Sequence, residues 1–254
     1  ETGRTFIHPF DDLDVITGQG TIAMEIVQEL PTVDYILAPV GGGGLVSGVA
    51  TLAKMLNPSI QVIGVEPIEA ASMSAALEAN QIVSLDTADT IADGTAVKTV
   101  GEHAFHYTKE NVDMMLTVED DELIGAFLDM VENHKMIVEN SGLLTVAALK
   151  QLDLQGKKVV AILSGGNMDV ITMSSIVQHG LIQRDRIFSV SVLLPDKPGE
   201  LVRVADTIAT AQGNVIKLEH NQFVSTNRNA AVELRITMES FGTEHKREIL
   251  KALE

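Results

Sequence analysis

Two glycine-bearing stretches contain the residue types best suited to ligand chemistry. In the first, Gly41, Gly42, Gly43 and Gly44 follow the apolar run YILAPV and precede a run with helical spacing. Glycine loses more chain entropy on folding than any other residue, so four in a row indicate that something approaches the backbone closely. A turn of this kind between a strand and a helix leaves amide N–H groups free at the positive end of the helix dipole. The pattern predicts a phosphate site, with close packing of helix on strand as the alternative.

The known nucleotide motifs do not match this loop. A dinucleotide fingerprint requires a third glycine five residues after the first, and counting from Gly41 or Gly42 that position holds Val46 or Ser47. The loop also lacks the lysine of a P-loop. Glu66 ends the next expected strand and could still bind a ribose. A nucleotide-dependent oxidoreductase therefore remains an alternative.

The second stretch, Ser164 to Asn167, reads Ser-Gly-Gly-Asn and follows another apolar run. In open α/β folds, ligands bind beyond the carboxyl ends of the strands. Two glycine-bearing loops at such strand ends favour a single ligand in the crevice between them, with one loop binding each end of that ligand.

The spacing of apolar residues predicts the elements that position these loops. Helices are expected over 20–30 with Pro31 after the last turn, over 45–56, over 123–131 and over 141–152 with Ser141 as cap. Strands are expected over 35–40, 61–67, 113–118 and 159–163. The strand, helix, strand order indicates an α/β domain with a parallel sheet. The unbroken apolar run 159–163 favours a strand covered on both faces.

The pattern changes near Arg186. Strands are expected over 187–196, 214–223 and 230–240, and helices over 197–213 and 243–254. This β-α-β-β-α order is one strand short of a ferredoxin-like module, so we expect an α+β domain truncated at its C-terminus. The predicted division is a first domain at 1–178, a charged linker at 179–186 and a second domain at 187–254.

Composition limits the partners. The formal net charge of −17 repels phosphate backbones and anionic lipid, so neither nucleic acid nor a membrane is an expected partner. The chain has no cysteine and no apolar run near the roughly 18 residues of a membrane span, and we expect a cytoplasmic protein. His103 and His106 lack a nearby third ligand for zinc, and no metal site is predicted.

Five segments in order resemble the threonine dehydratases, which are fold-type II pyridoxal-phosphate enzymes related to serine dehydratase and serine racemase. The segments, within residues 5–185, are HPFDDLDVITGQGTIAMEI, VGGGGLVSG, GVEP, TIADG and AILSGGN. The resemblance implies a tryptophan synthase β-like fold and pyridoxal 5'-phosphate as cofactor. It assigns the phosphate to Gly41, Gly42, Gly43, Gly44 and Leu45, the pyridine nitrogen to Ser164, and the pocket lining to Gly94 and Glu139.

A serine at the ring nitrogen has a chemical consequence. A hydroxyl, unlike a carboxylate, does not hold a proton on that nitrogen, so the ring is a moderate electron sink, which suits β-elimination. The alternatives are that Ser164 is only a turn residue and that Glu139 is only a solvated helix end.

The sequence departs from the family in two respects. The family's Schiff-base lysine lies in an N-terminal Ser-x-Lys-x-Arg-Gly motif, and nothing here matches it. We therefore expect an N-terminally incomplete catalytic domain, and no activity from residues 1–254 alone. Relatives also bind a divalent cation through a Glu, a carbonyl and an Asp; Glu66 and Ala70 match the first two, but Ser72 stands at the third.

Residues 187–254 resemble an ACT domain, most clearly in LLPDKPGELVRVADTIATAQGNVIKLEHNQ. The resemblance implies a regulatory site for a small amino acid, with threonine, isoleucine and valine as candidates. The residues it implies are Asp196, Gly199, Glu200, Leu201 and Asn214. A helix N-terminus after the first loop is suited to an α-carboxylate. The alternative is a dimerisation module without a ligand.

Together these features predict the function of the intact protein. We expect allosterically regulated deamination of L-threonine to 2-oxobutanoate and ammonia, as in isoleucine biosynthesis, by a homo-oligomer. A serine dehydratase, a serine racemase-type enzyme and a non-enzymatic amino-acid sensor are the alternatives.

Overall fold

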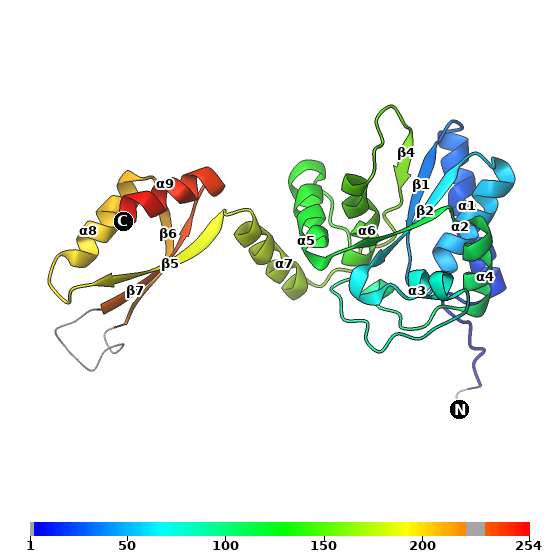
Figure 1. The fold of residues 1–254 in the computed structure, drawn as a ribbon, viewed down its shortest axis with the longest axis horizontal. Helices are drawn as coiled ribbons and strands as arrows, with labels where there is room; N and C mark the ends of the chain where they lie inside the picture. The colour runs from blue at the N-terminus through cyan, green and yellow to red at the C-terminus, as the bar shows by residue number, and fades with distance from the viewer. Residues whose placement is uncertain (1–2, 222–231) are drawn as a thin grey trace. The chain divides into compact units, whose positions relative to one another are not determined.

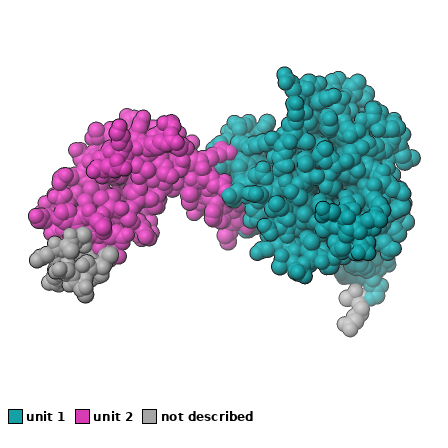
Figure 2. Space-filling view, viewed as in Figure 1, with its two compact units in different colours: residues 1–170 teal, residues 171–254 magenta. Residues whose placement is uncertain are grey.

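The structure is a computed structural model that describes residues 3–221 and 232–254. The chain divides into two compact units, residues 1–170 and residues 171–254, which Figure 2 distinguishes by colour. Each unit has a hydrophobic core and a sheet of its own. The two are therefore described separately.

The first unit alternates helices and strands (Figure 1). Its strands are β1 (Tyr35–Pro39), β2 (Gln61–Pro67), β3 (Met114–Val118) and β4 (Val159–Ala161). Its helices are α1 (Leu13–Glu29), α2 (Gly44–Leu56), α3 (Ser72–Ala79), α4 (Glu102–Asn111), α5 (Asp120–Asp129) and α6 (Asn140–Ala148), and α7 (Val170–Gln183) follows. Short helical turns occupy Ile68–Ala70, Asp93–Thr95, Met130–His134 and Leu149–Gln151.

The four strands of the first unit form a parallel sheet in the order β3-β2-β1-β4, which confirms the predicted parallel sheet. Leu37 of β1 lies opposite Ile63 of β2 and Ala161 of β4. Because the strands are parallel, the loops that follow β1 and β4 leave the same edge of the sheet.

One strand prediction needs correction. The apolar run 159–163 predicted a strand covered on both faces, but Val159, Val160 and Ala161 are only half-buried. The reason is position: within the described residues β4 pairs only with β1 and forms an edge of the sheet. Ile162 then leaves the strand while its N–H still donates to Leu37 O at 3.0 Å.

Helices cover both faces of this sheet: α1, α2 and α4 lie on one side and α5 and α6 on the other (Figure 1). The α1–α2 contact is close because each helix places a glycine there. A methyl group on Gly48 would lie 2.1 Å from Ile16 O, and one on Gly20 would lie 3.3 Å from Gly48 O. This contact fixes α2, whose N-terminus follows the four glycines.

Helix starts differ from the predicted ones where a cap was not recognised. α1 begins well before residue 20 because Asp12 accepts hydrogen bonds from the N–H groups of Asp14 and Val15. At α6 the N-cap is Glu139, and Ser141 is buried inside the first turn, so the predicted Ser141 cap is wrong.

The second unit contains β5 (Ile187–Leu194), α8 (Glu200–Thr210), β6 (Asn214–Asn221), β7 (Val232–Glu239) and α9 (Thr243–Leu253), after most of α7. Its antiparallel sheet has the order β5-β7-β6, and the β-α-β-β-α order matches the prediction. Residues 222–223 and 230–231 of two predicted strands lie outside the described residues.

The division of the chain differs from the predicted linker. Residues 179–183 of the expected linker continue helix α7, and the boundary between the units falls after Val170. The core of the second unit forms where α8 and α9 meet β7, around Ile208, Ile236 and Ile249, whose side chains are buried.

Candidate active site

The glycine loop joins β1 to α2 and leaves the start of that helix uncapped. Gly43 is the N-cap residue, with φ of +95°, a left-handed conformation that favours glycine, and no side chain caps the helix. The N–H groups of the first turn have no partner within a helix. Among the described residues, none accepts a hydrogen bond from the amides of Gly41, Gly42, Gly43, Gly44 or Leu45. The loop therefore offers a set of unpaired donors at the positive end of α2.

Close packing also acts on this loop. A methyl group on Gly42 would lie 2.2 Å from Cδ2 of Phe10, and one on Gly44 would lie 2.5 Å from Phe10 O. A methyl group on Gly43 would lie 2.4 Å from Cε of Met73. The packing alternative thus accounts for the missing side chains, and the unpaired amides leave donors that an anionic ligand or water can occupy.

The Ser-Gly-Gly-Asn loop follows the neighbouring strand. Leu37 and Ala161 form the last pair between β1 and β4, and four residues beyond each of them stand Gly41 and Gly165. The two glycine-bearing loops therefore leave adjacent strands at one edge. Ser164 is exposed, and its hydroxyl has no hydrogen-bond partner among the described residues.

Glu139 attaches this second loop to the start of α6. Its N–H donates to Gly165 O at 3.1 Å, and its Oε2 accepts a hydrogen bond from Asn167 N at 3.0 Å. A methyl group on Gly165 would lie 2.3 Å from Oε1 of Glu139, so the carboxylate rests directly against the loop. The side chain is half-buried and hydrogen-bonded, which argues against the solvated helix end left open above.

The segment Gly94–Thr95 connects the two loops. A methyl group on Gly41 would lie 2.9 Å from Cα of Thr95. A methyl group on Gly94 would lie 2.9 Å from Oγ of Ser141 and 3.4 Å from Oε1 of Glu139. The structure thus places the predicted residues Gly41, Gly94 and Glu139 in one contiguous region with the loop that bears Ser164.

Two side chains hold the segment before Gly94 in place. Asp120 accepts hydrogen bonds from Thr90 Oγ1 at 2.6 Å and from Ile91 N at 3.0 Å. Asn140 Nδ2 donates to Ile91 O at 2.8 Å. These contacts tie the segment to the starts of α5 and α6, so the site is built at the ends of several elements.

Besides Asp120 and Asn140, the sequence prediction missed the contributions of Phe10, Thr95, Ser141 and Asn167 to the site. Each of them lies in or next to a segment quoted for the family resemblance, or within the predicted helix that begins with Ser141. Their contacts to the loops join positions far apart in the chain, which spacing does not reveal.

Glu66 is buried at the end of β2 and has a structural role. Its carboxylate accepts hydrogen bonds from Met73 N at 2.7 Å, Ser74 N at 2.9 Å and Ser74 Oγ at 2.6 Å, at the start of α3. Burial raises the pKa of the Glu66 carboxyl, and the hydrogen bonds from Ser74 and Met73 only partly offset that effect. Both oxygens are occupied, so Glu66 does not present itself to a ribose.

The described residues contain neither a metal-binding cluster nor a membrane-spanning helix. No group of three or more His, Cys, Asp or Glu side chains is placed to hold a metal ion there. Within the same residues no helix combines the length and the apolar character needed to cross a membrane.

The effector residues predicted in the second unit do not meet. Asp196 to Leu201 follow β5 and lead into α8, whose N-cap Gly199 has φ of +96°. Asn214 begins β6 opposite Glu239, and Glu239 lies opposite Ile187 at the start of β5. Asn214 is therefore at the other end of the sheet, because α8 runs back along the sheet over about 16 Å between them.

Comparison with known proteins gives the family. A parallel α/β sheet with two glycine-bearing loops at its carboxyl edge is typical of α/β proteins that bind a ligand there. Residues 1–165 match the family described as pyridoxal-phosphate dependent enzyme. The chain belongs to this family, and the nucleotide-dependent oxidoreductase alternative is set aside.

Individual relatives are more specific. An L-threonine ammonia-lyase of Geobacter sulfurreducens is 40% identical over 257 residues, which cover 100% of this chain and 64% of the relative. A threonine deaminase isoform 2 of Solanum lycopersicum has a TM-score of 0.66 and 40% identity, covering 69% of this chain and 52% of that one. A serine racemase of Dictyostelium discoideum has a TM-score of 0.60 and 42% identity, covering 65% and 53%. The chain spans less than two thirds of the curated relative's length.

Proposed function

We propose that the whole protein deaminates L-threonine to 2-oxobutanoate and ammonia with pyridoxal 5'-phosphate as cofactor. The observation that carries the proposal is the set of unpaired amides in the tetraglycine loop, next to a loop that presents an unpaired serine hydroxyl. Membership of the pyridoxal-phosphate family and the names of the relatives support the same reaction.

The donor set suits the two ends of the cofactor. The amides of Gly41 to Leu45 would hold the phosphate, because backbone N–H groups at a helix N-terminus favour a dianion. The hydroxyl of Ser164 would meet the ring nitrogen as a neutral partner. When bound, pyridoxal phosphate supplies an electron sink for negative charge at the α-carbon of an amino acid. Since a hydroxyl leaves the nitrogen without a held proton, the sink stays moderate, as elimination requires.

The remaining residues of the region would position these groups. Glu139 holds the loop of Ser164 through Gly165 O and Asn167 N. Phe10 covers Gly42 and keeps water from that side of the glycine loop. The site thus depends on residues that fix two loops without touching the reacting atoms.

None of the lysines of this chain stands in the motif that the resemblance assigns to the Schiff-base lysine. No stretch matches Ser-x-Lys-x-Arg-Gly, and Lys54, for example, binds Ile60 O at 2.6 Å and Asp113 at 2.7 Å. We therefore propose that residues 1–254 alone do not deaminate threonine. A purified chain of these residues that released 2-oxobutanoate from threonine would contradict this.

Product analysis of the full-length protein tests the reaction. We expect 2-oxobutanoate and ammonia from L-threonine, and a slower release of pyruvate from L-serine. Formation of D-serine without keto acid would instead support the racemase alternative, which the serine racemase structure keeps open. Ammonia without either keto acid would contradict both.

We further propose that the second unit is an ACT-like regulatory domain that binds a small amino acid. Its β-α-β-β-α order and the extension of the Geobacter relative's match over the whole chain support this role. A change in the full-length protein's KM for threonine on adding valine or isoleucine would support it. An unchanged KM with both would reject regulation by either.

The same unit supports a proposal of homo-oligomerisation. β5 and β6 each pair on one side only within the described residues, and every residue of β6 is exposed. Val215 and Leu218 on that strand expose 38% and 41% of their surface. Exposed edge strands are prone to pair with another chain. Light scattering after size exclusion should give a mass of at least two chains, and a monomer would contradict the proposal.

A further inference from the structure

Residues 8–11, His-Pro-Phe-Asp, form a turn that packs against the glycine loop. His8 Nδ1 accepts hydrogen bonds from Asp11 N at 2.9 Å and from Phe10 N at 3.4 Å. The His8 ring also meets the Phe10 ring edge-on, with centroids 4.5 Å apart and 87° between the planes. A side-chain acceptor that binds N–H groups two and three residues later fixes a turn, as asparagine does in an Asx-turn. His8 therefore fixes the 8–11 turn.

Phe10 is the residue of the 8–11 turn that touches the glycine loop directly. Its ring would meet a methyl group on Gly42, and its backbone O and Cα would meet one on Gly44, at 2.5 and 2.8 Å. The turn thus contacts two glycines of the loop, one through a side chain and the other through the backbone.

Asp11 reaches the same loop through helix α4. Its Oδ2 accepts a hydrogen bond from Glu102 N at 2.9 Å, and its Oδ1 accepts one from Ala104 N at 3.1 Å. Gly101 is the N-cap residue of α4 and has no side chain to cap the helix. Its own N–H donates to Gly42 O at 3.1 Å. Asp11 therefore fixes the start of α4, and the start of α4 holds Gly42.

The first turn of α4 also packs closely on both sides of this contact. A methyl group on Gly43 would lie 3.0 Å from Cβ of Ala104, and one on Gly101 would lie 2.3 Å from Oδ1 of Asp11. Gly101 has φ of −70°, which residues with a side chain adopt readily. A glycine is therefore needed at position 101 because Asp11 lies against it, and not because of the backbone conformation.

Asp11 also determines which helix start is open to an anion. The starts of α2 and α4 both present N–H groups at the positive end of a helix dipole, and the bond from Gly101 N to Gly42 O joins them. The carboxylate of Asp11 occupies N–H groups of α4. The amides of residues 41–45 have no acceptor among the described residues, so an anion is directed to α2.

We propose that Asp11 is a positioning residue for the cofactor phosphate. It holds the glycine loop in its anion-binding form through α4 and closes the start of α4 to the phosphate. This inference rests on the proposed function, since the phosphate is that of pyridoxal 5'-phosphate. Asp11 acts through Gly101 and Gly42, and His8 supports it by fixing the turn.

Equilibrium dialysis of the full-length protein tests the proposal with pyridoxal 5'-phosphate and with pyridoxal, which lacks the phosphate. Asp11→Ala should weaken binding of pyridoxal 5'-phosphate by about tenfold, since hydrogen bonds to charged groups are the stronger ones. Binding of pyridoxal should change much less, so the ratio of the two affinities should fall. Asp11→Asn keeps one acceptor oxygen and should give an intermediate ratio. A wild-type ratio in Asp11→Ala would overturn the proposal.

Two further positions disturb the same contacts without removing Asp11. Gly101→Ala places a methyl group against the Asp11 carboxylate and should also lower the affinity ratio. His8→Ala removes the acceptor that fixes the turn and should lower the ratio, whereas His8→Asn supplies an oxygen for the same N–H groups and should stay closer to wild type. A wild-type ratio in Gly101→Ala would contradict the contact between α4 and Asp11.

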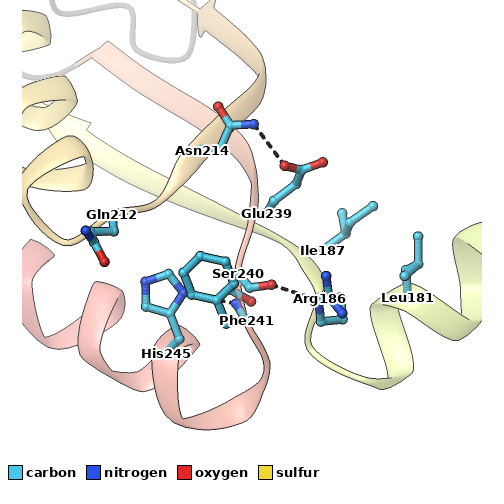
Figure 3. A pocket seen from close by; sticks show the side chains of 9 residues that line it. All are labelled: Leu181, Arg186, Ile187, Gln212, Asn214, Glu239, Ser240, Phe241 and His245. Atoms are coloured by element: carbon cyan, nitrogen blue, oxygen red, sulfur yellow. Dashed lines mark hydrogen bonds between the residues drawn. The ribbon is translucent and has the colours of Figure 1, made fainter.

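Asp12→Ala and Arg186→Ala are the controls. Asp12 caps α1 through the N–H groups of Asp14 and Val15, so its removal costs a helix cap one residue away from Asp11. In the second unit, Arg186 Nε donates to Ser240 O at 3.0 Å (Figure 3). Both controls should lower thermal stability and keep the affinity ratio. An equal fall of the ratio in Asp12→Ala would show that loss of stability is the cause and would overturn the proposal.

Hydrogen exchange without cofactor separates this inference from the proposed function. Ser47 N donates to Gly43 O at 3.0 Å, so its exchange reports on the junction of the glycine loop and α2. This amide should exchange about tenfold faster in Asp11→Ala and at the wild-type rate in Asp12→Ala. If it does and the wild type binds no pyridoxal 5'-phosphate, only the proposed function fails. Threonine deamination by the wild type, with a wild-type affinity ratio in Asp11→Ala, would overturn this inference alone.

Discussion

At the scale of single residues, a substitution of Ser164 is the most selective test of the proposed contact with the ring nitrogen of the cofactor. Its hydroxyl is exposed and makes no hydrogen bond to the described residues, so removing it leaves no buried group unpaired. Ser164→Ala should therefore keep the thermal stability of the protein. It should lower kcat/KM for threonine in the full-length enzyme by about tenfold, because one hydrogen bond is lost. Ser164→Thr retains the hydroxyl and should stay closer to wild type. Unchanged kcat/KM in Ser164→Ala would remove Ser164 from the site.

Glu66 makes a prediction about pH. Burial raises its pKa above the ordinary value of 4.5, so the folded state holds this proton more tightly than the unfolded state. The stability that Glu66 contributes is full below pH 4.5 and is lost as pH rises through the raised pKa. Glu66→Gln loses one hydrogen bond at α3 and should be less stable than wild type at low pH, with a gap that narrows as pH rises above 4.5. Urea unfolding at a series of pH values measures this difference in unfolding free energy between wild type and variant. A difference that widens as pH rises above 4.5 would contradict the account.

Residue roles were predictable from the sequence where a local pattern carries them. The free amides of residues 41–45 follow from four glycines between a strand and a helix, and they have no acceptor among the described residues. Ser141 was wrongly predicted as a cap because Glu139, two residues earlier, takes the N-cap position. The packing of Phe10 on Gly42 was not predictable, because the contact joins residues 32 positions apart in the chain.

At the scale of elements, the glycine loop is constrained by packing as well as by a ligand. Gly42→Ala would place its methyl group 2.2 Å from the Phe10 ring, and overpacking of this kind costs about 1–3 kcal/mol of unfolding free energy. The affinity of the Gly42→Ala variant for pyridoxal 5'-phosphate should also fall, because the loop must shift to accommodate the methyl group.

Gly18→Ala is the matched control, since a methyl group there meets nothing within 4 Å and the site lies inside α1. It should stabilise the protein by about 0.5–1 kcal/mol. Chemical denaturation and equilibrium dialysis with the cofactor measure the two effects. Wild-type stability in Gly42→Ala would show that the loop is not packed as described.

Helices and strands were predictable where residues within the element itself determine where it begins and ends. The strand 61–67 matches β2 in both bounds because Val62, Ile63 and Val65 give it a short β-rich run. Helices α3 and α4 were not predicted, and both have caps from distant positions: Glu66 for α3 and Asp11, which accepts from Glu102 N and Ala104 N, for α4. Such caps act through the tertiary fold and leave no periodic pattern.

At the scale of the whole molecule, the two units have separate cores and should lose them in separate steps. Ile208 is buried in the core of the second unit, and replacing it by alanine should cost that unit about 2–5 kcal/mol. In calorimetry of the full chain, Ile208→Ala should lower one transition and leave the other in place. A single transition that moves as a whole would show that the units unfold together.

The domain order followed from the change of pattern near Arg186, but the boundary did not. The charged residues Arg184, Asp185 and Arg186 led to a predicted linker over 179–186, yet residues 179–183 complete α7, whose Ile176 is buried. Likewise Asn214 was grouped with residues 196–201 because strand order within a small sheet is not evident from one sequence. β5 and β6 each pair antiparallel with β7 and therefore run in the same direction, so Asn214 at the start of β6 lies at the opposite end of the sheet from the residues that follow β5.

The most direct test of the central claim is the crystal structure of the protein with pyridoxal 5'-phosphate bound. The account predicts phosphate oxygens about 2.9 Å from amide nitrogens of Gly41 to Leu45 and the ring nitrogen within hydrogen-bond distance of Ser164 Oγ. A phosphate bound elsewhere, or a ring nitrogen that meets a carboxylate and not Ser164, would contradict it.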